Sequence, residues 1–194
     1  MELTDYQREA LASIHRHLET ERSTLAVMPT GTGKTVLFSA WAHSRREIGP
    51  ALVVAHRREL IEQATDRLRR FGLEVEIEMA DQRSRPHSMH PADVVVASVQ
   101  SMSAKRMRKF GPDYFASIVV DEAHHSTASS YRRILDYFAG AKVLAVTATP
   151  NRADGVGLHN ICESVAYEYS LAEAIRAGYL VRPRCSRSTS TTSI

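Results

Sequence analysis

Apolar residues along this chain recur at helical spacing in some segments and form short, strand-like runs in the segments between them. After Thr4, a residue suited to capping a helix, apolar residues recur at helical spacing and predict an amphipathic helix over residues 5–20. Further helices are expected from about residue 33 and over residues 58–71, 127–139 and 171–177. Short apolar or β-branched runs, which are typical of strands, lie between them at residues 24–28, 51–55, 74–78, 93–97, 117–120 and 142–147.

This alternation predicts an α/β fold, with a doubly wound, mostly parallel sheet and helices on both faces. Residues 74–78 alternate glutamate with valine and isoleucine, as expected of a strand that is wet on one face. In doubly wound sheets, ligands bind at the carboxyl ends of the strands. Four segments that could carry chemistry follow predicted strands, and they begin at Pro29, His56, Asp121 and Thr147.

Length and composition add bounds to this picture. The 194 residues suffice for one well-packed domain, which we place at residues 1–181, and the polar, Ser/Thr-rich residues 182–194 are expected to be disordered. The formal net charge of +3 is mildly basic, and the small clusters of Lys and Arg are most simply solvated helix faces. Neither a signal peptide nor a long apolar segment is evident, so we expect a soluble, cytoplasmic protein without a membrane partner.

Residues 29–35, Pro-Thr-Gly-Thr-Gly-Lys-Thr, connect a predicted buried strand to a predicted helix. The glycines permit backbone conformations in which successive N–H groups face phosphate oxygens at a helix start. Lys34 would reach the β- and γ-phosphates, and the Thr35 hydroxyl would bind Mg²⁺. The strict phosphate-loop pattern has a glycine where this chain has Met28, so an ordinary glycine-rich turn is the alternative. The predicted nucleotide-binding residues of the loop are Thr30, Gly31, Thr32, Gly33, Lys34 and Thr35.

A pair of carboxylates, Asp121 and Glu122, follows the apolar run at residues 118–120. A carboxylate at the end of a buried strand suits Mg²⁺, and we expect Asp121 to hold the metal through water. Glu122 would then orient and deprotonate the attacking water. Two solvated acids that cap the next helix are the alternative. The adjacent His124 and His125 do not indicate zinc, because neighbouring residues on a helix cannot both face one ion.

These segments together resemble the motifs of superfamily 2 helicases. The segments that resemble motifs I, II and III are residues 31–35, 121–124 (Asp-Glu-Ala-His) and 147–150 (Thr-Ala-Thr-Pro). Tyr6-Gln7 resembles the Q-motif region, and residues 55–60 and 97–101 are similar to motifs Ia and Ib. The similarity extends from about residue 3 to residue 181, with its later part resembling the branch of restriction translocase subunits and DNA-repair helicases. It implies a RecA-like P-loop NTPase fold that uses ATP and Mg²⁺.

The resemblance also implies roles for individual residues. Gln7 would read the adenine edge, and His124 would link the hydrolysis site to Thr147 and Thr149, coupling hydrolysis to domain movement. Contacts to the nucleic-acid backbone would come from Arg57, Ser98 and Gln100. Such contacts carry little sequence preference, and the branch favours DNA over RNA. A surface glutamine, a core histidine and an exposed helix start are the respective alternatives.

One element of these helicases is not found in the sequence. They need a second RecA-like domain, whose motif VI supplies arginines to the transferring phosphoryl group, and no Gln-x-x-Gly-Arg-x-x-Arg occurs here. A missing arginine finger lowers turnover by roughly 10³–10⁵. We therefore expect the first, ATP-binding domain of a DNA helicase, active only weakly until a second domain joins it in cis or in trans. The alternatives are a naturally short module that binds DNA or a partner helicase, and an unrelated P-loop ATPase. The sequence does not predict the oligomeric state.

Overall fold

The computed structural model describes residues 2–79, 82–86, 89, 91–121, 128–149 and 162–181. The helices are α1 (Asp5–Thr20), α2 (Lys34–Arg45), α3 (Arg58–Arg70), α4 (Ala104–Met107), α5 (Ala128–Tyr137) and α6 (Leu171–Arg176). The strands are β1 (Ser23–Val27), β2 (Ala51–Ala55), β3 (Val75–Glu78), β4 (Val94–Ser98), β5 (Ser117–Asp121), β6 (Lys142–Thr147) and β7 (Ser164–Glu168).

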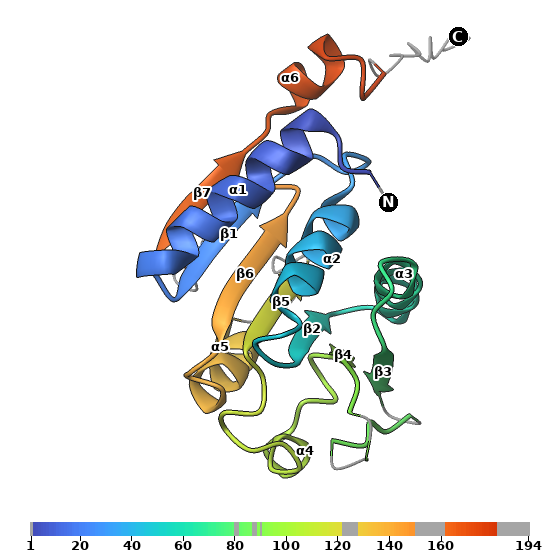
Figure 1. Ribbon diagram of the computed structural model, residues 1–194, viewed down its shortest axis with the longest axis vertical. Helices are drawn as coiled ribbons and strands as arrows, with labels where there is room; N and C mark the ends of the chain where they lie inside the picture. The colour runs from blue at the N-terminus through green and yellow to red at the C-terminus, as the bar shows by residue number, and fades with distance from the viewer. Residues whose placement is uncertain are drawn as a thin grey trace, which may run out of the picture.

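Within the described residues the strands form one sheet in the order β3-β4-β2-β5-β6-β1-β7 (Figure 1). Every neighbouring pair in this sheet is parallel. From β1 the chain crosses to β2, then to the edge strand β3, and back to β4 between β3 and β2; β5 and β6 then fill the positions between β2 and β1, and β7 pairs with the other side of β1. The predicted doubly wound α/β fold is confirmed, with a sheet that is parallel throughout the described part.

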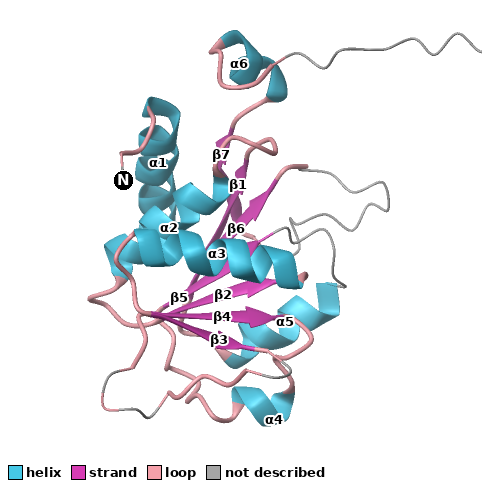
Figure 2. Cartoon of the chain, turned by 90° about the vertical axis from the view of Figure 1, so that its right-hand side faces the viewer, coloured by secondary structure: helices cyan, strands magenta, loops and turns pink. Residues whose placement is uncertain are grey.

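Helices cover both faces of the sheet, and Figure 2 shows α1 and α2 on one side and α5 on the other. On the first face, Ile14, Leu37 and Trp41 are fully buried against alternate strand residues. On the second, Tyr131 and Phe138 of the α5 region are buried against the intervening strand residues. Each such side chain contributes about 1.5–3 kcal/mol when fully buried, so this two-sided core fixes the strand ends that carry the site.

The predicted elements agree with the structure for α1, β2 and β6 to the residue. Two elements, β7 and the four-residue α4, have no counterpart among the elements expected from the sequence. The expectation that β3 is wet along its glutamate face is wrong at Glu78, which is fully buried. It is buried because Ser84 and the segment around α4 fold over this end of the strand and hydrogen bond to its carboxylate.

Candidate nucleotide and nucleic-acid site

The loop between β1 and α2 has the shape of a phosphate-binding turn. Gly31 and Gly33 have φ values of +89° and +83°, a region that residues with a Cβ rarely occupy. The turn is closed by Thr32, whose N–H and hydroxyl both donate to the Pro29 carbonyl, at 3.3 and 2.7 Å. Thr30 is exposed and lines a neighbouring hollow of about 380 Å³ together with Ala148.

Lys34 begins α2 and is 9% exposed. Its Nζ lies 3.3 Å from the carbonyl oxygen of Met28, so the amine folds back along the loop. Met28 replaces the glycine of the strict pattern, and its side chain is fully buried in the core. Its N–H donates to the Thr147 carbonyl at 2.9 Å, which ties the start of the loop to β6. The departure from the pattern is therefore accommodated by packing. Thr35 lies in the first turn of α2.

The phosphate loop is anchored to α1 through the Thr32 carbonyl. The Tyr6 hydroxyl donates to it at 2.7 Å, and Gln7 Nε2 donates to it at 3.1 Å. Gln7 Oε1 in turn accepts from the Thr4 N–H at 3.1 Å, and the residue is 5% exposed. Gln7 thus holds the loop in this structure, and the predicted contact with adenine requires these bonds to be exchanged.

Tyr6 is a site residue to which the sequence alone assigns no role of its own. Its ring stacks on Tyr169 with a centroid distance of 4.7 Å and meets Tyr179 edge-on at the same distance. Tyr169 directly follows β7 and Tyr179 lies shortly after α6, so both rings are far from Tyr6 in the sequence. The only sequence signal is the adjacency of Tyr6 to Gln7.

Asp121 and Thr147 lie at the same edge of the sheet as the phosphate loop. Asp121 is the last residue of β5 and is 5% exposed, and Thr147 ends β6 and is fully buried. Because β6 separates β5 from β1, Asp121 lies two strand spacings, or about 10 Å, from the strand that enters the loop. The Thr147 hydroxyl bonds with the backbone of Thr149 at 3.1 and 3.2 Å. Glu122 and His124 lie outside the described residues.

The residues at this edge fit a magnesium ion chemically. A carboxylate from Asp121 and a hydroxyl from Thr35 are hard oxygen ligands, the type that Mg²⁺ prefers, and water and phosphate oxygens complete such sites. Within the described residues, no three His, Cys, Asp or Glu side chains gather into a cluster that could hold a metal ion by itself. Burial raises the pKa of the Cys162 thiol to about 12, so this thiol is protonated at neutral pH.

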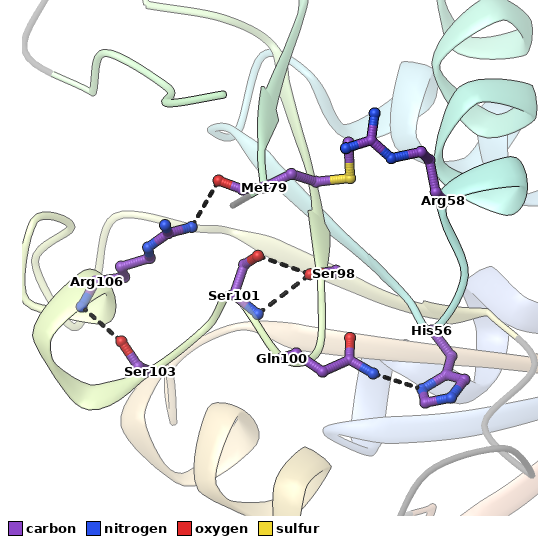
Figure 3. A pocket seen from close by; sticks show the side chains of 8 residues that line it. All are labelled: His56, Arg58, Met79, Ser98, Gln100, Ser101, Ser103 and Arg106. Carbon is purple, nitrogen blue, oxygen red and sulfur yellow. Dashed lines mark hydrogen bonds between the residues drawn. The ribbon is translucent and has the colours of Figure 1, made fainter. Parts of the chain in front are cut away.

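A second cleft, of about 420 Å³, lies farther along the same sheet (Figure 3). The predicted contacts Ser98 and Gln100 both line it. Ser98 Oγ donates to Ser101 Oγ at 2.7 Å, and Gln100 Nε2 lies 3.0 Å from His56 Nδ1. The other described residues that line the cleft are Arg58, Met79, Ser103 and Arg106.

Arg57, the third predicted contact, is exposed at the start of α3 but does not line this cleft. The residues that carry positive charge into the cleft are instead Arg58 and Arg106, and none of the described residues that line it is acidic. Both arginines belong to basic pairs that the sequence displays, at residues 57–58 and 105–106. The described lining of the cleft therefore holds two arginines and no acidic side chain, and one of these arginines, Arg106, is paired with the buried Glu78.

In the part of the chain that the structure describes, no helix is long and apolar enough to cross a membrane. A parallel α/β sheet that carries a Gly-x-Gly-Lys-Thr loop at the end of β1 and an acid at the end of β5 defines a RecA-like P-loop domain.

The comparisons with known proteins identify the family. The family described as "Type III restriction enzyme, res subunit" matches residues 1–152, and the chain belongs to it. "Putative mitochondrial ATP-dependent helicase irc3" of Schizosaccharomyces pombe is 32% identical over 95% of this chain and 32% of its own length. "Type I restriction enzyme EcoAI endonuclease subunit" of Escherichia coli is 29% identical over 90% of this chain and 23% of its own length.

Among solved structures, the Pyrococcus furiosus Hef helicase domain matches 88% of this chain and 39% of its own with a TM-score of 0.70 and 25% identity. The restriction-modification enzyme LlaGI, solved with a DNA substrate mimic, gives a TM-score of 0.76 at 18% identity over 92% of this chain and 21% of its own. These matches confirm an N-terminal RecA-like domain of the restriction-subunit branch of superfamily 2 helicases. The chain spans about a third or less of the length of these curated relatives.

Proposed function

We propose that the chain is the ATP- and nucleic-acid-binding domain of a superfamily 2 DNA helicase or translocase. The observation that carries the proposal is the phosphate loop, with Gly31 and Gly33 in the left-handed region and the Lys34 amine 3.3 Å from the Met28 carbonyl at the start of the loop. The names of the relatives support the use of ATP, since the Schizosaccharomyces pombe protein is described as an ATP-dependent helicase. In the full-length protein, ATP hydrolysis would be coupled to movement along a strand.

The residues at the sheet edge divide the work on the nucleotide. Backbone N–H groups of residues 31–35 would hold the phosphates, with Lys34 placing its charge between them. Thr35 and Asp121 would hold Mg²⁺, which when bound supplies positive charge to the phosphate oxygens. Glu122 would orient and deprotonate the attacking water, while His124, Thr147 and Thr149 would pass the loss of the γ-phosphate to the rest of the domain.

The second cleft would bind the backbone of a single strand. Ser98 and Gln100 offer polar contacts, and Arg58 and Arg106 supply charge. Arg57 lies between two lining residues, His56 and Arg58, in the sequence. Contacts of this kind are made with phosphate and read no bases, so little sequence preference is expected. The Escherichia coli relative is named a restriction enzyme subunit, which supports DNA rather than RNA as the ligand.

Hydrolysis by the 194-residue chain alone is expected to be slow, below about 1 s⁻¹, because no arginine finger is supplied by a second domain. Glu122→Gln should retain nucleotide binding and lower the residual rate further, since it removes the base and keeps the shape of the side chain. Phosphate release and binding of a fluorescent ATP analogue measure the two effects separately. Turnover well above about 1 s⁻¹ without a partner, or loss of binding in Glu122→Gln, would contradict these roles.

A further inference from the structure

The turn that follows α6 packs against the phosphate loop at two points. Leu180 is half-buried, and its Cδ2 lies 3.1 Å from the position that a Cβ on Gly31 would occupy. Tyr179 meets the ring of Tyr6 edge-on at a centroid distance of 4.7 Å. The Tyr6 hydroxyl in turn donates to the Thr32 carbonyl of the loop at 2.7 Å. Two neighbouring residues of the turn therefore reach the loop, one beside Gly31 and the other through Tyr6.

Hydrogen bonds of the backbone hold this turn in place. Gly178 has a φ of +78° and reverses the chain at the end of α6. The N–H groups of Tyr179 and Leu180 both donate to the Ala174 carbonyl, at 2.9 and 3.1 Å, as is common where a helix ends at a left-handed glycine. Ala174 itself is fully buried. The side chains of Tyr179 and Leu180 are thus presented to the loop from a fixed backbone.

The strand before α6 is joined to the strand that enters the loop. Strand β7 pairs with β1, and the Tyr169 N–H extends this pairing by donating to the Val27 carbonyl at 2.8 Å. The Tyr169 ring stacks on Tyr6, and Tyr169 also lines the hollow beside Thr30. Tyr6 is 9% exposed and packs against both Tyr169 and Tyr179, so its hydroxyl is held where these two rings place it.

Support from outside matters for a loop that is rich in glycine. Gly31 and Gly33 give the loop more backbone freedom than other residues would. A loop that is already held in its binding shape loses less of this freedom when a ligand binds. Leu180 and Tyr6 act on successive loop residues, Gly31 and Thr32. Their contacts therefore favour nucleotide binding without touching the nucleotide.

We propose that Tyr179 and Leu180 are positioning residues for the nucleotide, and that residues 164–181, which form β7, α6 and the turn, control the nucleotide affinity of the domain. The inference rests on the proposed function and adds a control point outside the residues expected to touch ATP. Tyr179 is 44% exposed, so this point can be reached from the surface. A partner that displaces the turn would loosen the loop and lower nucleotide affinity.

The test compares Tyr179→Ala with Tyr167→Ala in the full 194-residue chain. Tyr167 belongs to the same aromatic group, but its ring contact is with Tyr169 rather than with Tyr6. In a titration of a fluorescent ATP analogue with Mg²⁺, we expect Tyr179→Ala to bind roughly three- to tenfold more weakly, as the loss of an aromatic pair implies. Tyr167→Ala should change the affinity by less than about twofold. Tyr179→Phe keeps the ring and should bind as the wild type does.

Tyr6→Phe distinguishes positioning from a general loss of stability. It keeps the ring contacts of Tyr6 and removes the hydroxyl that donates to the Thr32 carbonyl. If Tyr179 acts through this hydroxyl, adding Tyr179→Ala to Tyr6→Phe lowers the affinity much less than Tyr179→Ala lowers it in the wild type. Leu180→Ala tests the contact beside Gly31 independently and should also weaken nucleotide binding, so the role of the turn is decided even if one variant does not fold.

The possible outcomes separate this inference from the proposed function. If the wild type binds nucleotide and both Tyr179→Ala and Leu180→Ala bind it equally well, the inference fails and the proposed function stands. Tighter binding by these variants would show that the turn restrains the loop, and it would overturn the positioning role. If Tyr179→Ala causes its full loss in the Tyr6→Phe background, the route through Tyr6 is wrong. If the wild-type chain does not bind nucleotide at all, the proposed function fails together with the inference.

Discussion

Replacing Lys34 by alanine is expected to abolish the binding of Mg²⁺·ATP. The amine lies folded along the loop, 3.3 Å from the Met28 carbonyl, and on our account it moves onto the phosphates when nucleotide binds. Hydrogen bonds to charged groups are worth about 1.5–3 kcal/mol each, so the loss of contacts with two phosphates weakens binding at least about 100-fold. Titration of a fluorescent ATP analogue measures the change.

A second lysine offers a matched control for this experiment. Lys142 starts β6 at the amino ends of the strands, opposite the end that carries the phosphate loop, and its Nζ donates to the Glu21 carbonyl at 2.7 Å. Lys142→Ala removes the same charge and the same atoms far from the phosphate loop, and it should leave nucleotide affinity unchanged. If Lys34→Ala bound nucleotide as well as Lys142→Ala, the loop would not be the nucleotide site.

Gly33→Ala is expected to disrupt the loop and to lower the stability of the protein. A Cβ at this position would lie 2.5 Å from Gln7 Nε2, and the φ of +83° is itself strained for alanine by about 1–2 kcal/mol. Relief of the clash displaces Gln7 from the Thr32 carbonyl, at a further cost of about 1 kcal/mol. We therefore expect a loss of about 2–3 kcal/mol in the free energy of unfolding, together with a loss of nucleotide binding.

Gly72 supplies the control, because it has nearly the same φ of +78° and a methyl group added there would meet no atom within 4 Å beyond its chain neighbours. Gly72→Ala should cost only the backbone strain of about 1–2 kcal/mol and should retain nucleotide binding. Urea unfolding of the two variants, followed by nucleotide titration, compares them. Equal losses in both variants would show that Gly33 matters for its backbone conformation alone and that the contact with Gln7 carries no weight.

Much of the fold was predictable because parallel strands buried on both faces read as continuous apolar runs. The residues of β2 are all buried, and its predicted bounds agree with the structure. Strand β7 has a different pattern because it pairs with β1 at the edge of the sheet and leaves Val165 and Glu168 exposed. Its mixed polar and apolar sequence carries no clear strand signal.

The candidate site was likewise predictable from the sequence only in part. The backbone of the phosphate loop follows from glycines and a lysine at fixed spacing, which a sequence displays directly. The anchoring of the loop to α1 does not follow from the sequence, because Tyr6 and Gln7 hydrogen bond to the Thr32 carbonyl, which is 26 and 25 residues away. The burial of Glu78 was not predictable for a related reason. Alternation along β3 indicates which face of the sheet the side chain occupies, but not that Ser84 and the segment around α4 cover it.

On the proposed function, this domain binds nucleotide and nucleic acid as one coupled system. The most direct test is the affinity of the 194-residue chain for a fluorescent ATP analogue with Mg²⁺, measured with and without saturating oligothymidine. Coupling between two sites requires that each ligand change the affinity for the other by the same factor. We expect nucleotide to bind and its affinity to change when the strand is present. Failure to bind nucleotide, or an affinity that the strand does not alter, would contradict the account.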